Sequence, residues 1–231
     1  MSRMIERRVQ DIALVHLEQR YHSKARGGRM YSRIEVRTRK KYGGKRADGL
    51  LAFKRWLLGT YVVSMEAKSF KTLPAMKPYR DDRIWLTNSL WAGLLILLGT
   101  GAFLFLFRKS DGFWQFLIPL NVFLLATAAY AYFTRNSYRH KVVDVIDQVH
   151  QYPANEKWLA FSADSFYDIL SQKQEDVKTI CKYQGIGIII VHSERRVDIL
   201  SEPKTRLKLR KDYLIYYSKE DDIRAAIAKP S

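Results

Sequence analysis

The sequence has little of the residue types that build covalent cross-links and zinc sites. It contains a single cysteine, Cys181, among 231 residues. One cysteine excludes an internal disulfide and fits a reducing compartment. The five histidines are scattered without the spacing of metal ligands and without a nucleophile beside them, so they indicate neither a zinc centre nor a catalytic dyad. We also expect no signal peptide, because charged residues begin at Arg3.

Acidic residues are scarce relative to basic ones. The chain has 40 Lys and Arg against 23 Asp and Glu, a formal net charge of +17. Most of the excess lies in residues 1–83, which hold 21 basic and 8 acidic residues. A basic lobe of this kind fits a nucleic-acid partner, because phosphates attract Lys and Arg. Membrane topology is a second cause of the same bias, and both can act together.

Charged residues are absent altogether from two long stretches. Residues 84–107 run for 24 positions without a charge, and residues 113–134 form a second uncharged run after a short turn. Each run is long enough to cross the hydrocarbon core of a bilayer. We therefore predict a transmembrane helical hairpin over residues 84–134. The alternative is a buried helical pair, but a domain of this size would struggle to cover two helices that are apolar all round.

The charges that flank this hairpin predict its orientation. Basic residues gather beside its two outer ends and are few in its turn, so by the positive-inside rule both termini lie in the cytoplasm. We expect an integral membrane protein with two transmembrane helices, as in a bacterial inner membrane. The outer ends carry Lys77, Arg80, Arg83, Arg135, Arg139 and Lys141, and the turn carries Arg108 and Lys109.

A β-hairpin is predicted within the basic lobe. Residues 48–53 are an apolar run that opens on an acid, and residues 61–68 are a second run rich in β-forming residues after a Gly-Thr turn. Side chains alternate along a strand, so Glu66 and Lys68 share one face. Antiparallel pairing would bring Asp48 beside them.

Two carboxylates and a lysine in one place suit a metal-dependent hydrolase. Neighbouring carboxylates repel each other, and a hard cation such as Mg²⁺ or Mn²⁺ relieves that repulsion. The cation lowers the pKa of a bound water and stabilises charge on a phosphate. A lysine beside it can orient the water or neutralise the phosphate. The plainer interpretation is a half-buried hairpin with exposed charges.

This pattern resembles the PD-(D/E)XK superfamily of restriction-endonuclease-like nucleases, and within it the Mrr-like enzymes. Asp48 matches the first acid of the motif, and Glu66-Ala67-Lys68 matches its E-X-K part. Ala47 stands where the family has proline. The resemblance implies that Asp48, Glu66 and the Ala67 carbonyl hold Mg²⁺ or Mn²⁺. It also implies that Lys68 orients or activates the attacking water.

A glutamate early in the first helix completes the metal site in the Mrr-like pattern. Residues 3–22 have apolar residues at helical spacing, and Glu6 lies near the start of this predicted helix. The resemblance therefore makes Glu6 the fourth catalytic candidate. The alternative is a solvated acid that the positive end of the helix dipole favours.

A basic turn lies directly before Asp48, and a further lysine follows the E-X-K tripeptide. We predict that these residues bind the nucleic-acid backbone, because they lie beside the acidic site. A solvated loop is the alternative. The residues are Arg39, Lys40, Lys41, Lys45, Arg46 and Lys71.

The soluble segments on either side of the membrane hairpin complement each other. Residues 1–83 supply one helix and three strands, which would leave a sheet face uncovered. Residues 135–231 supply the missing helices and strands. We therefore predict an α/β fold in which one restriction-endonuclease-like domain, a mixed sheet flanked by helices, is interrupted by the hairpin 84–134. The resemblance covers residues 3–70 and 142–203, and two separate small domains are the alternative.

These patterns together favour a membrane-anchored, Mg²⁺-dependent endonuclease that acts on DNA. Restriction or defence fits the resemblance, and RNA is an alternative substrate. Cutting both strands would need a homodimer or two successive events. Two other classes stay open: a nuclease-like scaffold that binds nucleic acid without catalysis, and a channel or pore-forming effector controlled by its cytoplasmic domain.

Overall fold

The structure, a computed structural model, contains two compact units. One is made of residues 1–78 together with residues 143–231, and the other is residues 79–142. The segments before and after the predicted membrane hairpin thus belong to the same unit. The residues that the structure describes are 4–55, 59–69, 74, 77–107, 112–169, 171–207 and 212–228.

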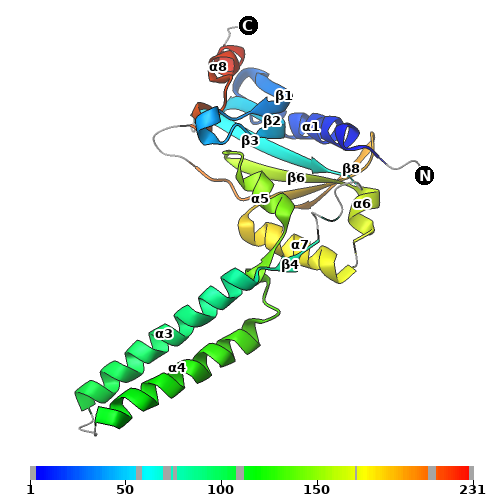
Figure 1. Ribbon diagram of the computed structural model, residues 1–231. Coiled ribbons are helices and arrows are strands. Elements are labelled where there is room, and N and C mark those ends of the chain that lie inside the picture. The colour runs from blue at the N-terminus through cyan, green and yellow to red at the C-terminus, as the bar shows by residue number, and fades with distance from the viewer. Residues whose placement is uncertain are drawn as a thin grey trace. The chain divides into compact units, whose positions relative to one another are not determined.

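A six-stranded mixed sheet forms the centre of the first unit (Figure 1). Its strand order is β1-β2-β3-β6-β7-β8. Strands β3, β6 and β7 run parallel, and the remaining neighbours are antiparallel. The strands are Met30–Arg37 (β1), Arg46–Arg55 (β2), Gly59–Lys68 (β3), Glu156–Ser162 (β6), Gly187–Ser193 (β7) and Arg196–Ser201 (β8).

The pairing of β3 with β6 joins the two soluble segments across the insert. Val63 pairs with Glu156, and Lys68 pairs with Phe161. All residues of β6 and most of β7 are buried. A central strand that is covered on both faces has to be apolar almost throughout, which explains the continuous apolar run seen in β7.

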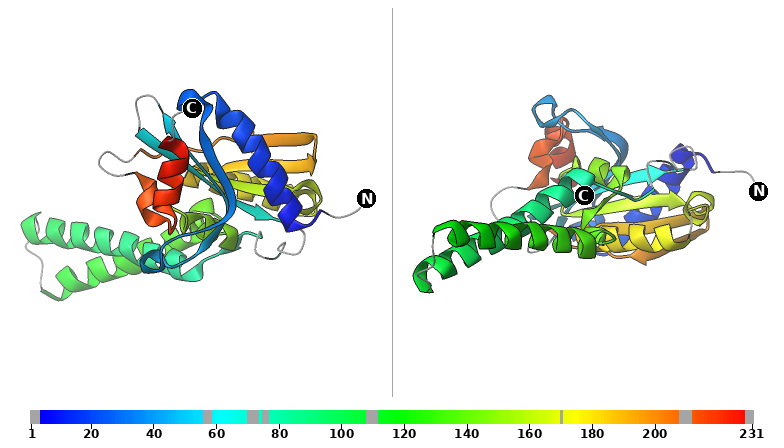
Figure 2. Two further views of the ribbon diagram at one scale, coloured as in Figure 1. Left: turned by 90° about the horizontal axis from the view of Figure 1, so that it is seen from above. Right: turned by 60° about the horizontal axis from the view of Figure 1, so that its bottom comes forward.

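Helices cover both faces of this sheet, so the predicted α/β class is confirmed (Figures 1 and 2). On one face, Val9, Ala13 and Leu17 of α1 pack with Met65 and Trp158. The opposite face is covered by α8 near β1 to β3, and by α5, α6 and α7 near β6 and β7. These helices are Glu6–His22 (α1), Asp144–His150 (α5), Ala163–Tyr167 (α6), Ser171–Gln184 (α7) and Glu220–Ala228 (α8).

A buried polar cluster ties the end of α1 to the sheet. Glu156 accepts hydrogen bonds from the hydroxyls of Tyr21 and Tyr61 and, at 2.6 Å, from Thr205. Trp158 Nε1 donates to the Tyr21 hydroxyl at 3.0 Å. Burial and the Glu156 carboxylate raise the pKa of both tyrosines, which keeps their hydroxyls as donors. The cluster thus joins the last turn of α1 to β3 and β6.

Two long helices closed by a short β-ribbon make up the second unit. They approach closely at Gly93, where an added Cβ would lie 2.0 Å from Thr127 Oγ1. Trp85 Nε1 donates to the Ala131 carbonyl at 3.2 Å. Both helices are long and apolar enough to cross a membrane, and most of their residues are exposed. The elements are Tyr79–Arg80 (β4), Asp82–Phe107 (α3), Gly112–Thr134 (α4) and Lys141–Val142 (β5).

Candidate active site

The hairpin of β2 and β3 brings Asp48 to the E-X-K tripeptide. The two strands pair in antiparallel register as far as Gly49 and Met65. At Asp48, the residue before Gly49, the side chain replaces the backbone as the hydrogen-bond partner of β3. Asp48 Oδ2 accepts a 2.8 Å hydrogen bond from the Ala67 backbone N–H. Asp48 and Glu66 therefore lie next to each other although 18 positions separate them, which is the arrangement that the sequence predicts.

Lys68 and Glu66 form a buried ion pair beside Asp48. Lys68 Nζ lies 2.7 Å from Glu66 Oε1, and only 7% and 6% of the two side chains are exposed. Charges that lose their water on folding are tolerated only when they are paired and hydrogen-bonded. A half-buried hairpin with exposed charges is therefore the wrong description of these residues.

The two buried carboxylates of the site, Asp48 and Glu66, repel each other. Burial raises the pKa of Glu66 to about 7, the Asp48 carboxylate adds to this rise, and the Lys68 ammonium opposes it. Burial also raises the pKa of Asp48, although the Ala67 N–H and Lys68 favour its charged form. One lysine thus faces two buried carboxylates, and a further positive charge would stabilise the site.

Glu66 offers an oxygen atom to such a charge. Its Oε2 is buried and accepts no hydrogen bond from the part of the chain that the structure describes. The described residues contain no group of three or more His, Cys, Asp or Glu side chains that could hold a metal. Two carboxylates are nevertheless enough ligands for a hard cation such as Mg²⁺, which takes one or two protein carboxylates and completes its shell with water or phosphate oxygens.

The first turn of α1 reaches the same site. The charge of Glu6 raises the pKa of Glu66, so the structure brings this predicted residue near the pair. Gln10 follows one helical turn later, is buried, and lowers the pKa of Asp48 by hydrogen bonding. The sequence analysis missed Gln10. Its spacing of four residues from Glu6, on the same helix face, is the signal that would have found it.

Tyr152 is a second residue that the sequence analysis missed. Its hydroxyl donates a 2.8 Å hydrogen bond to the Arg46 carbonyl. Its pKa is raised mainly by burial, and the charges of Glu66 and Asp48 raise it further. Tyr152 comes from beyond α3 and α4, shortly after α5, so no local pattern in the sequence connects it with the site.

The backbone of β1 is strained opposite Asp48. Pairs between β1 and β2 are formed at Ile34–Gly49 and at Val36–Ala47. Between them Glu35 adopts a φ of 57°, the only positive φ of a non-glycine residue among those described. Left-handed backbone is costly for a residue with a Cβ, and such strain is often found at functional sites.

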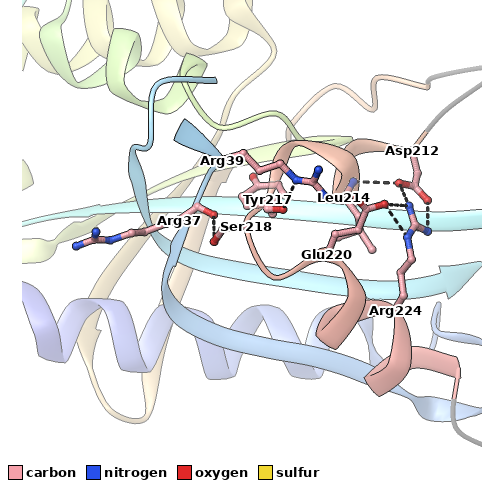
Figure 3. A network of polar contacts seen from close by, with 8 residues as sticks. All are labelled: Arg37, Arg39, Asp212, Leu214, Tyr217, Ser218, Glu220 and Arg224. Carbon is pink, nitrogen blue, oxygen red and sulfur yellow. Dashed lines mark hydrogen bonds and ion pairs between the residues drawn. The ribbon is translucent and has the colours of Figure 1, made fainter. Parts of the chain in front are cut away.

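The predicted basic turn is only partly available to nucleic acid. Arg39 donates from Nε to the Tyr217 carbonyl at 3.1 Å, and its Nη2 lies 2.5 Å from Glu220. Arg224 in turn binds Asp212 and Glu220 (Figure 3). Arg39 therefore has a structural role in joining the turn to the C-terminal segment.

The other members of the turn are exposed. Arg46 is closest to the site, since its charge lowers the pKa of Asp48, and it lies 3.5 Å from Glu35. Lys40, Lys41 and Lys45 are exposed further along the turn. Lys71 lies outside the described residues.

Comparison with protein-family models, with curated proteins and with solved structures gives no match to this chain. The resemblance to PD-(D/E)XK nucleases therefore rests on the sequence motif. The structure shows that Asp48 binds the backbone of the E-X-K tripeptide and that Glu66 and Lys68 pair at 2.7 Å.

Proposed function

We propose that this chain is a membrane-anchored, Mg²⁺- or Mn²⁺-dependent endonuclease that hydrolyses phosphodiester bonds of DNA. The observation that carries the proposal is the convergence of Asp48, Glu66 and Lys68 in one buried site where β2 and β3 stop pairing. A stability role alone gives no reason to bury two carboxylates beside one lysine.

Each residue has a role that its surroundings support. Asp48 and Glu66 would hold the metal through their carboxylates, with the Ala67 carbonyl as a further ligand. When bound, the metal supplies an activated water and stabilises charge on the phosphate. Lys68 Nζ lies 2.7 Å from Glu66 Oε1 and would orient the water or neutralise the phosphate. Glu6 and Gln10 approach from α1, where Gln10 would hold Asp48 in position.

The fold supports the same proposal at a coarser level. Helix α1 is followed by β1, β2 and β3, and after the insert α5 is followed by β6, which lies parallel to β3. A helix, three strands, a helix and a strand is the order that the resemblance to restriction-endonuclease-like nucleases implies. On this reading a single nuclease domain is interrupted by the pair α3 and α4.

Helices α3 and α4 would anchor the enzyme in a membrane. Their exposed surface is dominated by large apolar side chains, such as Leu95, Phe105 and Phe133, of which 66%, 82% and 82% are exposed. In water this surface would favour aggregation, whereas in a bilayer it faces lipid. By the positive-inside rule, Arg80, Arg83 and the basic residues after α4 would then favour a cytoplasmic nuclease unit.

The proposal is tested by cleavage of plasmid DNA with the full chain in detergent, in the presence of Mg²⁺, Mn²⁺ or EDTA. Asp48→Ala and Lys68→Ala should abolish metal-dependent cutting. Ser64→Ala is the matched control, because Ser64 is buried on the same strand and face, but its hydroxyl forms no hydrogen bond within the described chain. Cutting that survives both site substitutions would exclude the assigned site. DNA binding without cutting would favour the scaffold alternative.

A further inference from the structure

A cavity of about 600 Å³ lies between the start of α1 and the turn that joins β7 to β8. Both segments lie at the end of the sheet where β3 and β6 also end, as the views in Figures 1 and 2 agree. The cavity is therefore on the same edge of the sheet as the candidate active site. The residues that matter on its lining are Met4, Ile5, Arg8, His192, Glu194 and Arg195.

Strand register gives the separation of the cavity from the active site. Lys68 is in register with Phe161 of β6, which is in register with Ile190 of β7. His192 lies two strands across from Lys68 and two residues further along β7, which gives roughly 12 Å from the usual strand spacing and rise per residue. Glu6, whose charge acts on Glu66, directly follows Ile5 of the cavity wall. The start of α1 thus borders both places.

The lining combines apolar side chains with arginines that can bind a phosphate. Ile5 exposes 57% of its surface. Arg8 pairs with Glu194 at 2.7 Å, but 59% and 67% of these side chains are exposed. An exposed ion pair of this kind contributes little, so Arg8 can exchange the carboxylate for a phosphate. Arg195 lines the same space. Guanidinium groups recognise phosphates through paired hydrogen bonds, and an apolar wall suits the face of a base.

We propose that this cavity binds one nucleotide of the substrate strand, displaced from the bond that is cut. Its base would lie against Met4 and Ile5, and its phosphates against Arg8 and Arg195. A stacked strand advances about 3.4 Å per nucleotide, so a roughly 12 Å separation corresponds to a few nucleotides. A base that enters a cavity has left its stack. The substrate is therefore single-stranded, or locally unpaired beyond the bond that is cut. This inference rests on the proposed nuclease function and deepens it.

The test measures binding of fluorescent single-stranded DNA of increasing length by the full chain in detergent and EDTA, where no cleavage occurs. The variant is Arg8→Ala with Arg195→Ala. The matched control is Arg7→Ala with Arg196→Ala, which removes the same charge from neighbouring exposed positions that do not line the cavity. Cleavage with Mg²⁺ is measured on the same samples.

Wild type should gain affinity once the strand is long enough to span both places, and the Arg8/Arg195 variant should lose this gain. We expect its Kd for long strands to rise roughly tenfold, and the slope of log K against log salt to fall by about 1.4, or about 0.7 for each lost phosphate contact. The control should behave as wild type.

Equal binding by the two double variants, with cleavage by wild type, would overturn the cavity inference and leave the nuclease proposal standing. A wild-type protein that neither binds nor cuts DNA would overturn both. A gain in affinity with length that survives loss of Arg8 and Arg195 would also exclude the cavity.

Discussion

Asp48→Asn should stabilise the metal-free protein and remove its response to metal. Asn keeps an oxygen that can accept the 2.8 Å hydrogen bond from the Ala67 N–H, while it removes one of the two buried charges. Lys68 keeps its 2.7 Å contact with Glu66. The substitution therefore removes the repulsion between the carboxylates, together with the attraction of Asp48 to Lys68 and Arg46, while it keeps the packing of the site.

The size of the effect follows from the pKa of Glu66, which is raised from 4.5 to about 7. Such a rise corresponds to about 3 kcal/mol of free energy spent on keeping Glu66 ionised above neutral pH. Burial is the largest cause and Asp48 the second. We therefore expect Asp48→Asn to increase the free energy of unfolding by about 1 kcal/mol at pH 8, which raises Tm by about 2–4 °C for a unit of this size.

The pH dependence has a definite sign. A carboxyl group whose pKa is raised by folding contributes stability below its unfolded pKa, and this contribution is lost as the pH rises through its folded pKa. For Glu66 the loss falls between about pH 4.5 and 7. The advantage of Asp48→Asn should therefore be small at pH 5 and full at pH 8.

Unfolding of the first unit can be measured by chemical labelling of Cys181. It is the single cysteine of the chain, is fully buried in the first unit, and burial raises its pKa to about 12. A thiol-reactive dye therefore labels it only when that unit unfolds, independently of α3 and α4. Unfolding is followed in EDTA and with Mn²⁺, which should stabilise wild type at pH 8 but not Asp48→Asn. A variant that is less stable than wild type at pH 8 in EDTA would refute the reasoning from like charge.

Three further predictions concern other parts of the chain. Glu35→Gly should increase the free energy of unfolding by about 1 kcal/mol, because glycine adopts the φ of 57° without strain, whereas Glu35→Ala should give no such gain in the same labelling assay. Burial, followed by the charge of Arg206, lowers the pKa of Lys157 to about 8. The free energy of unfolding of wild type should therefore rise between about pH 8 and 10, and Lys157→Met should flatten this rise in a pH series of melts. An unchanged slope would place Lys157 in water. Gly93→Ala should weaken the pairing of α3 with α4 in a denaturing-detergent titration, because the added Cβ would lie 2.0 Å from Thr127 Oγ1. Gly99→Ala should have no effect, because a Cβ added at Gly99 meets nothing within 4 Å. Equal sensitivity of the two glycine variants would contradict the observed contact.

Most secondary-structure elements could be predicted because each is encoded by a local pattern. Apolar residues at helical spacing predicted a helix over residues 3–22, and α1 spans Glu6–His22. Two uncharged runs predicted the long helices that became α3 and α4. Two runs of apolar and β-forming residues around a Gly-Thr turn predicted the hairpin that became β2 and β3. Burial of one helix face leaves a periodic signal, and burial of a whole element leaves a continuous apolar run, and neither needs knowledge of the partner.

Part of the candidate site was also accessible, because a hairpin is a local structure. Antiparallel pairing across a short turn fixes which residues meet, so alternation along β3 and the position of Asp48 were enough to place three side chains together. Their burial was not accessible, since it depends on elements that arrive from elsewhere in the chain. Arg39 illustrates the same limit: a charge in a basic turn reads as a phosphate contact, but the C-terminal Glu220 occupies it.

What the sequence determined by itself is thus the set of elements, the two apolar helices, and the local hairpin that carries Asp48, Glu66 and Lys68. Only the tertiary structure decided that β3 lies parallel to β6 across the insert, that Gln10 and Tyr152 approach the carboxylates, and that a cavity opens beside the start of α1. The physical reason is range. Periodicity and turns act between residues close in the chain, whereas the pKa of Glu66 and the shape of the cavity depend on side chains that only the folded core brings together.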